Sequence, residues 1–413
     1  MVLPVPAFRS GPGTFEIESA FAEHLRMLRS RLGSLASPLV LALPEFSAEG
    51  RARLGRLGQI DEAREGIVFR PMFPASIGRL AYLRSLPQVL SALHEEVASA
   101  DVIHASSSTL YRPFEIIALM MGSALGKKTI SVTDIDNRRS PEMNYRSGRW
   151  SRRELWVTRL VHQPYAHLQQ LAEVRRCSLV LMKGRGLVED YGRGRGHVKH
   201  FLDSAFSQDQ IAPAEAVERK IADLTDPAKP LRVVYFGRLV AYKGIDHMLR
   251  AFRRAIDAGA NLRFEIIGEG EQEAELRGLC SELLLDPWVT FAGAVPFGPA
   301  LFERLYRNHL LLAAPLSQDT PRSALDAFAA GQAILAYDTY YYAELAAMGA
   351  PVTVVPWLSI DALGDGLVAI ASNRAGLAPR IRAALAFARE NTQEKWLDQR
   401  IDWTRALFAQ TAG

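Results

Sequence analysis

The hydrophobic positions of this chain follow two patterns that alternate along its length. In the first half, short apolar runs appear in LVLALPEF, GIVFRPMF, DVIHASS and KTISVTDID. Between them lie longer stretches in which apolar residues recur every three or four positions, as around 86–98 and 116–125. The runs predict buried strands and the periodic stretches predict amphipathic helices. Because strands that alternate with helices form parallel sheets covered on both faces, we expect an α/β protein.

The second half repeats the alternation in VVYFG, LRFEIIGEGE, WVTFAGAV, LLLAAPL, QAILAYD and PVTVV, and then becomes mostly helical. This repetition predicts two doubly wound parallel-sheet domains. We place an N-terminal domain at 1–206 and a C-terminal domain at 230–390. Residues 207–229 are rich in Ala, Asp and Pro and are predicted as a linker. Residues 391–413 predict a closing amphipathic helix.

Composition places the chain in a reducing compartment. Cys177 and Cys280 lie far apart without metal-ligand spacing, so we expect neither a disulfide nor a metal site from them. The first residues lack the pattern of a signal peptide, and the most apolar helix candidate is too short to span a bilayer and contains Glu115. We therefore expect a cytoplasmic protein, either dissolved or held at the inner face of a membrane.

The positive charge of the chain is concentrated in its first half. Residues 1–215 carry 28 Lys and Arg against 22 Asp and Glu, whereas residues 216–413 carry 21 against 23. Within 138–159, arginines are interleaved with aromatic residues: Arg138, Arg139, Tyr145, Arg146, Arg149, Trp150, Arg152, Arg153, Trp156 and Arg159. Such a stretch suits an anionic membrane surface, a lipid-phosphate acceptor or nucleic acid, and it also suits a solvated helix. We expect peripheral membrane contact through 138–159 and no nucleic-acid partner.

The most informative stretch is LRVVYFGRLVAYKGIDHMLR, from Leu231 to Arg250. It predicts a buried strand, a turn led by Gly237 and a helix entered near Gly244, with Arg238 and Lys243 between strand and helix. Free N–H groups and cations meet at such a junction, which makes it an anion site in open α/β sheets. An arginine fork and a lysine point charge together suit a diphosphate. The alternative is a pair of solvated loop charges.

Three further positions in the first half are candidate ligand-binding residues. Val2 to Phe8 predicts a strand that leads through Gly11 and Gly13 into a helix from about Phe15, and these glycines would let the backbone approach a ligand. A plain turn is the alternative. His104 is predicted at the end of a strand, where it would face the cleft or be satisfied within the core.

Two other short motifs carry weaker signals. Asp134 and Asp136 form an Asp-x-Asp pair, whose two carboxylates could hold a metal, but we expect no metal here. Gly268 and Gly270 lack the third glycine of a dinucleotide-binding fingerprint, so they point only weakly to an oxidoreductase or epimerase.

The second half resembles the large family of retaining, nucleotide-sugar-dependent glycosyltransferases with a GT-B fold, family 4. The similarity is carried by VVYFGRLVAYKGIDHMLRAF, FEIIGEGE, VTFAGAV and LLLAAPLSQDTPRSALDAFAAGQAILAYD, across most of 231–340. It implies two facing Rossmann-like domains and a C-terminal helix that crosses back to the first. It also implies no cofactor, a UDP- or GDP-linked sugar as co-substrate, and a glycan or lipid-linked acceptor in polysaccharide or glycoconjugate biosynthesis.

The resemblance also assigns roles to individual residues. Arg238 and Lys243 match the diphosphate-binding pair, and Gly237 lies in the same segment. Asp326 falls on the second of two family glutamates and would bind the ribose hydroxyls. Gln318 falls on the first glutamate, which faces the donor sugar. An amide cannot stabilise positive charge as a carboxylate does, so Asp319 is the natural substitute.

The family's Gly-rich turn between these two glutamates is replaced here by polar residues, and we expect three of them to contact the donor: Thr320, Arg322 and Ser323. Pro321 removes one backbone donor, and the same residues also predict a helix start with a Thr cap. Tyr340, Tyr341 and Tyr342 are expected to form a wall of the donor pocket. The leading hypothesis is a sugar transferase, and the alternative is a GT-B protein that binds a nucleotide sugar or a partner enzyme without catalysis.

Overall fold

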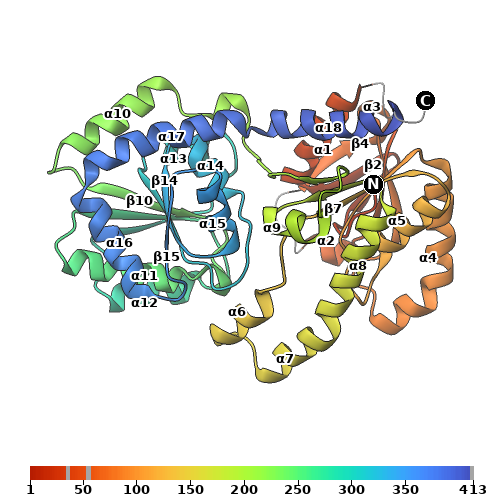
Figure 1. Cartoon of the computed structure of the whole chain (residues 1–413), viewed down its shortest axis with the longest axis horizontal. Coiled ribbons are helices and arrows are strands. Elements are labelled where there is room, and N and C mark those ends of the chain that lie inside the picture. The colour runs from red at the N-terminus through yellow and green to blue at the C-terminus, as the bar shows by residue number, and fades with distance from the viewer. Residues whose placement is uncertain (34–37, 53–56, 410–413) are drawn as a thin grey trace. The chain divides into compact units, whose positions relative to one another are not determined.

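The computed structural model describes residues 1–33, 38–52 and 57–409, so the end of the predicted closing segment, 410–413, lies outside the described residues. The chain forms two compact units (Figure 1). The first unit comprises Met1–Asp134, Val157–Phe201 and Leu397–Gly413, and the second comprises Ile135–Trp156 and Leu202–Trp396.

The second unit is built on one parallel sheet of six strands in the order β12-β11-β10-β13-β14-β15. Its strands are β10 (Leu231–Phe236), β11 (Leu262–Ile267), β12 (Val289–Gly293), β13 (Leu310–Ala313), β14 (Ala333–Tyr337) and β15 (Val352–Val355). The order reverses between β10 and β13, and an open α/β sheet binds its ligands in the crevice at such a reversal. The predicted α/β architecture with parallel sheets in two domains is confirmed.

Helices flank this sheet because each has an apolar face to bury. Helix α11 (Ile245–Asp257) is the clearest case, since Met248, Leu249 and Phe252 are buried while its outer positions are polar. The other helices of the unit outside 135–156 are α10 (Ala214–Thr225), α12 (Glu273–Glu282), α13 (Pro299–Leu305), α14 (Ser323–Ala329), α15 (Tyr340–Ala347), α16 (Ile360–Ser372) and α17 (Leu377–Glu390).

The first unit also contains parallel strands. They are β3 (Leu39–Glu45) paired with β5 (Ile67–Pro74), and β6 (Val102–Ser106), β7 (Lys128–Thr133), β8 (Leu179–Met182) and β9 (Val198–His200) in sequential order. Val2 bridges the two sets, because it pairs with Ala42 of β3 and with Ala105 of β6. The first apolar run therefore contributes isolated bridges rather than the full strand that we predicted.

An antiparallel sheet of β1 (Phe8–Gly11), β2 (Thr14–Glu18) and β4 (Leu57–Asp61) replaces the predicted loop and early helix start. Gly11 ends β1 and pairs with Thr14, and Gly13, at φ +68°, lies in the turn of the β1–β2 hairpin. The prediction of a strand-to-helix loop at Gly11 and Gly13 is wrong. Phe15 and Ile17 alternate with polar residues and are buried, a period-2 pattern, so the helix begins only at Ser19.

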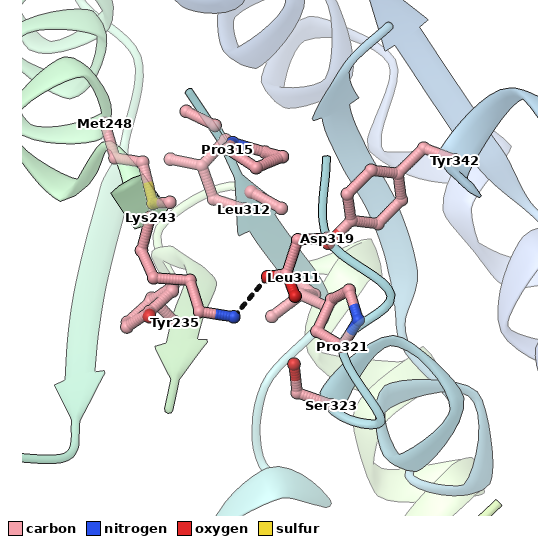
Figure 2. A pocket seen from close by; sticks show the side chains of 12 residues that line it. Tyr235, Lys243, Met248, Leu311, Leu312, Pro315, Asp319, Pro321, Ser323 and Tyr342 are labelled. Carbon is pink, nitrogen blue, oxygen red and sulfur yellow. Dashed lines mark hydrogen bonds and ion pairs between the residues drawn. The ribbon is translucent and has the colours of Figure 1, made fainter. Parts of the chain in front are cut away.

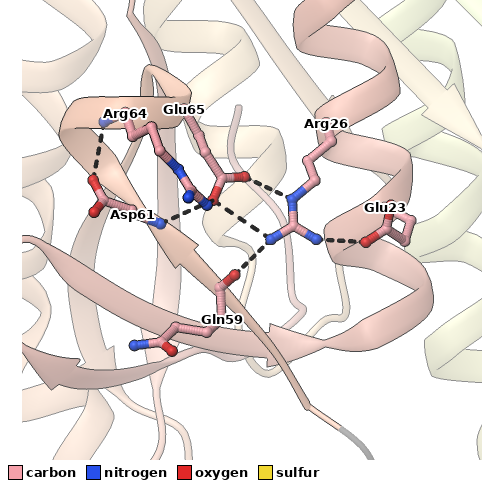
Figure 3. Close-up of polar contacts among 6 residues, drawn as sticks. All are labelled: Glu23, Arg26, Gln59, Asp61, Arg64 and Glu65. Carbon is pink, nitrogen blue, oxygen red and sulfur yellow. Dashed lines mark hydrogen bonds and ion pairs between the residues drawn. The ribbon is translucent and has the colours of Figure 1, made fainter.

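The helices of the first unit and of the segment 135–156 are α1 (Ser19–Leu32), α2 (Ala48–Ala52), α3 (Glu62–Glu65), α4 (Arg79–Ser99), α5 (Phe114–Ala124), α6 (Ser140–Arg146), α7 (Arg152–Val157), α8 (Gln163–Arg176) and α9 (Arg185–Leu187). A polar network joins α1 to the antiparallel sheet (Figure 3). Arg26 donates to the Glu65 carboxylate at 2.6 Å and to the Gln59 carbonyl at 2.5 Å. Glu65 also accepts the Asp61 backbone N–H at 3.1 Å.

Two segments differ from the predicted domain map. Residues 207–229 contain helix α10, whose Ala216, Val217, Lys220 and Leu224 are buried, because their spacing places them on one helix face. This stretch is therefore part of the second unit rather than a linker. Residues 135–156 also belong to the second unit, although they lie between parts of the first.

The closing helix α18 (Gln393–Ala409) packs its later part in the first unit. Leu397 is buried in the hydrophobic cluster that contains Leu25 and Phe69, and Asp398 forms an ion pair with Arg31. Among the described residues, no helix combines the length and hydropathy needed to cross a membrane.

Candidate functional site

The turn after β10 is fixed by close backbone packing. Gly237 has φ +143° and donates its N–H to the Ile267 carbonyl at 3.0 Å. A Cβ at Gly268 would lie 1.9 Å from the Gly237 carbonyl oxygen, and a Cβ at Gly270 would lie 2.3 Å from the carbonyl of Leu239. Gly268 and Gly270 therefore let two loops approach each other, which accounts for them without a dinucleotide.

A fourth glycine, Gly244, sets the start of helix α11. Gly244 has φ +64°, and a Cβ there would lie 2.1 Å from the Ala314 carbonyl oxygen. The loop after β13 is held against the same place, since Leu316 donates its N–H to the Tyr242 carbonyl at 2.8 Å. These contacts bring Lys243 opposite the loop that carries Gln318 and Asp319.

Lys243 and Asp319 form an ion pair in this site, in which the lysine Nζ donates to an Asp319 carboxylate oxygen (Figure 2). Their side chains are only 15% and 13% exposed, so the pair is shielded from most solvent. Both residues line a pocket at the carboxyl edge of the sheet. Its other lining residues are Tyr235, Met248, Leu311, Leu312, Ala313, Ala314, Pro315, Pro321, Ser323 and Tyr342.

Tyr242 lies among three cations. Its hydroxyl accepts a hydrogen bond from Arg238 Nη2 at 2.8 Å, and the Lys243 Nζ is 5.1 Å from its ring centre. The Arg149 guanidinium is 5.5 Å from the same centre, and Arg149 Nη1 donates to Asn144 Oδ1 at 2.7 Å. Partial burial lowers the pKa of Arg149. Asp319 balances only one of these three positive charges, so the cluster keeps a net positive charge that favours an anion.

Arg149 lies beside Tyr242 because residues 138–156 of the stretch predicted for membrane contact belong to the second unit. Two other arginines of the stretch stack on aromatic rings of the second unit: Arg139 lies 4.3 Å from the Tyr340 ring centre and Arg146 lies 5.3 Å from that of Trp357. Cations over aromatic faces are attracted by the ring quadrupole. The earlier part of 138–159 therefore packs on the second unit.

Asp326, in α14, is buried with 4% of its surface exposed. Its Oδ1 has no hydrogen-bond partner in the described part of the chain. Burial raises the pKa of this carboxyl to about 8, while nearby Arg322 favours the charged form and Asp203 opposes it. An enclosed carboxyl oxygen without a donor is suited to a ligand hydroxyl. The nearby Arg322 Nε lies 3.1 Å from the Asp203 carboxylate.

The loop from Gln318 to Arg322 is only partly organised as predicted. Gln318 is half-buried and does not line the pocket, whereas its neighbour Asp319 does. Helix α14 begins at Ser323 after Arg322, with no side-chain cap, so the predicted Thr320 cap is wrong. Instead the Pro321 carbonyl accepts hydrogen bonds, from the Tyr341 hydroxyl at 3.1 Å and from the Ala324 N–H at 3.2 Å.

Other candidates take structural positions. His104 lies in the middle of β6 rather than at its end, and burial lowers the pKa of its imidazole well below the usual value. Asp136 accepts two hydrogen bonds from the Arg138 side chain, at 2.8 and 2.7 Å. Across 1–33, 38–52 and 57–409, no group of three histidine, cysteine or carboxylate side chains is arranged to hold a metal.

The sequence did not single out three residues of the site. Tyr242 precedes Lys243 directly, so its place beside the cations was foreseeable. Tyr235 donates its hydroxyl to the Arg238 carbonyl at 2.8 Å, which follows from its position near the end of β10. Arg149 lies 89 residues before Arg238, and no sequence signal links the two.

Comparison with known proteins finds a family match within the second unit. Residues 217–386 match the family described as Glycosyl transferases group 1. This chain matches the family model over 170 of its 413 residues, all within the second unit. Over 132 residues it is 31% identical to 2-deoxystreptamine glucosyltransferase of Streptomyces kanamyceticus. That match covers 31% of this chain and spans about a third (33%) of the relative's length.

Solved structures show that the likeness of fold extends over nearly the whole chain. Sucrose-phosphate synthase of Thermosynechococcus elongatus superposes with a TM-score of 0.66 at 15% identity, covering 99% of this chain and 98% of that one. Anabaena HepE in complex with UDP and glucose gives 0.62 at 15%, covering 98% and 99%. WaaG, a glycosyltransferase involved in lipopolysaccharide biosynthesis, gives 0.63 at 12%, covering 97% and 99%.

Proposed function

We propose that this protein transfers a sugar from a nucleotide-diphosphate sugar to a hydroxyl group of a glycan or lipid-linked acceptor, with retention of the anomeric configuration. The observation that carries the proposal is the cation cluster at Tyr242, beside the Lys243–Asp319 pair at the carboxyl edge of the sheet. The family of the domain supports the reaction class. The HepE complexes with UDP favour a uridine nucleotide over a guanosine one.

The described contacts suggest how the donor would be held. Its diphosphate would lie against Arg238 and Lys243, with Arg149 supplying a third charge. Its ribose hydroxyls would donate to the buried Asp326 carboxyl, whose Oδ1 has no partner in the described residues. Binding would thus balance the positive charge of the cluster. It would also give the Asp326 oxygen a hydrogen-bond donor.

The same side chains have roles in the transfer step. The acceptor oxygen forms a bond to the anomeric carbon, the bond from that carbon to the diphosphate breaks, and the acceptor proton leaves with the nucleotide. Arg238 and Lys243 stabilise the negative charge that grows on the diphosphate. The Gln318 amide cannot balance the positive charge on the sugar, so Asp319 supplies the carboxylate. We expect no metal and no further cofactor, because side-chain cations serve the diphosphate.

The test is donor turnover by the purified full chain. We expect UDP release from a UDP-sugar by the wild type, slowed by about a hundredfold or more in Lys243→Ala. Lys395→Ala removes an equal charge from an exposed site on α18 and should leave the rate unchanged. The anomeric configuration of a product, read by NMR, tests retention. Absence of both donor binding and UDP release would refute the proposal.

A catalytically silent protein remains the second candidate because Gln318 replaces a family glutamate. This second candidate predicts that the donor binds through Lys243 but that no UDP is released with any acceptor. In that case Gln318→Glu, which restores the carboxylate, is expected to gain turnover. If the wild type already turns over, the same substitution separates the contributions of Gln318 and Asp319.

A further inference from the structure

Exposed apolar side chains are concentrated on a small part of the surface. Of the 14 large hydrophobic side chains exposed among the described residues, eight belong to the start of α4, the loop before α5 and the helix 152–176. They are Leu80, Leu83, Tyr111, Trp156, Val157, Leu160, Val161 and Leu168. We call these eight residues the apolar face.

The helix contributes a continuous stripe to this face. Helix α7, a π-helical turn (Thr158–His162) and α8 follow one another without interruption. Trp156 and Leu160 lie four residues apart, as do Val157 and Val161, a spacing that makes the members of each pair neighbours on the helix surface. Leu160 is 69% exposed, an unusual state for a leucine within a helix.

Helix α4 adds to the same surface, as contacts among its first residues, Tyr111 and His162 show. Leu80, 72% exposed, and Leu83 lie three residues apart at its start. The Arg79 guanidinium lies 3.9 Å from the Tyr111 ring centre, and the Tyr111 ring packs edge-on against His162 at 5.5 Å. Tyr111 therefore joins the start of α4 to the π-helical turn.

The charges around the apolar face are predominantly positive. Five arginines belong to the same elements: Arg79, Arg84, Arg152, Arg153 and Arg159. Glu154 is the one acidic residue in 79–84 and 152–168, and its carboxylate accepts hydrogen bonds from the Ser151 N–H and hydroxyl, at 2.7 and 2.8 Å. A twofold dimer through this face would bring two sets of arginines together, so the charge disfavours a second copy of the chain.

We propose that the apolar face docks on the surface of an anionic lipid bilayer. Leucine and tryptophan side chains would enter the boundary between headgroups and acyl chains, while the arginines contact the lipid phosphates. Binding is interfacial, in keeping with the absence of a membrane-crossing helix among the described residues. The surface differs from the predicted 138–159, since it uses the end of that stretch together with 160–168 and α4.

This docking is independent of sugar transfer, because none of the eight residues lines the pocket with Lys243 and Asp319. It is tested by floating the full chain with phosphatidylcholine vesicles that contain or lack phosphatidylglycerol. We expect binding to the anionic vesicles only, and weaker binding at high salt. Each arginine near the surface should contribute about fivefold, so Arg84→Ala and Arg153→Ala each weaken binding, whereas Arg219→Ala on α10 does not.

The apolar contribution is tested by Leu80→Glu combined with Leu160→Glu, which we expect to weaken vesicle binding by about tenfold or more. Leu284→Glu is the matched control, because Leu284 is 73% exposed but is not part of the apolar face. All substituted side chains are exposed, so circular dichroism should show unchanged folding. Equal binding to neutral vesicles, no vesicle binding, or an unchanged double variant would overturn the proposal. Self-association abolished by the double variant, without vesicle binding, would instead assign the face to a second copy.

Discussion

The Nζ of Lys243 donates a hydrogen bond to the carboxylate of Asp319, 76 residues further along the chain. The pair joins the cation expected to hold the donor diphosphate to the carboxylate expected to replace a missing family glutamate. We expect the donor diphosphate to compete with Asp319 for Lys243. The two groups neutralise each other, which lowers the cost of keeping both charges where their side chains are only 15% and 13% exposed.

This pairing predicts opposite effects of Asp319→Asn on binding and on transfer. Without its carboxylate partner, Lys243 is available to the diphosphate, so UDP should bind about tenfold more tightly. Transfer should fall by about a hundredfold because the sugar loses its charge-stabilising group. Calorimetry and UDP release measure the two effects, and Asp361→Asn at an exposed ion pair is the control. Weaker UDP binding in Asp319→Asn would mean that Asp319 positions Lys243 instead of competing for it.

Arg149 is predicted to contribute to diphosphate binding through its place beside Tyr242. Arg149→Ala should weaken UDP binding by about fivefold to tenfold at low salt and by less at high salt, because partly exposed charges are screened. Arg146→Ala removes a similar cation over Trp357 and should change the affinity little. Equal effects of the two substitutions would show that the segment acts only through its packing.

Much of the second unit could be predicted from the sequence, because its local signals agree. The run from Leu231 to Phe236, Gly237 and the periodic α11 define a strand, turn and helix without reference to the rest of the chain. Arg238 and Lys243 follow from that order. The Lys243–Asp319 and Arg149–Tyr242 contacts could not be predicted, since each depends on how segments distant in sequence pack.

The first unit was harder to predict, since short segments there carry ambiguous patterns. A helix is predicted from about Phe15 because apolar residues follow at helical spacing, but the β1–β2 hairpin buries Phe15 and Ile17 with period 2. The α10 segment was assigned to a linker from its Ala, Asp and Pro content, although its buried positions fall on one helix face. In both cases packing outweighed composition.

Asp326 predicts a pH dependence of stability. Its pKa is raised from 3.8 to about 8 by burial, so the folded protein holds a proton that the unfolded chain releases. The resulting stability is fully present below about pH 4 and is lost as the pH rises through 8. Asp326→Asn should therefore raise the melting temperature more at pH 9 than at pH 5 relative to the wild type. An equal shift at both values would contradict a raised pKa.

The Arg26–Glu65 contact is predicted to stabilise the first unit at neutral pH. Burial opposes ionisation of Glu65, but hydrogen bonds from Arg26 and the Asp61 N–H outweigh it and hold the pKa of Glu65 below its usual value. The stability from this contact is present above the unfolded pKa and is lost in acid. Arg26→Ala should lower the free energy of unfolding by about 1–3 kcal/mol in urea denaturation at pH 7.

Arg64→Ala is the control for this contact, because Arg64 is exposed and lies 3.4 Å from Glu65. It should cost less than about 1 kcal/mol. Equal losses from the two arginines, or an Arg26→Ala effect that persists unchanged in acid, would contradict the assigned role of the network.

The most direct test of the central claim is calorimetric titration of UDP into the wild type, Arg238→Ala and Lys243→Ala, with Lys395→Ala as the control. If the carboxyl edge of the second-unit sheet holds the donor diphosphate, both site variants should lose about tenfold or more in affinity while the control binds as the wild type does. Wild-type affinity in both site variants, or no UDP binding by any protein in the series, would contradict the account.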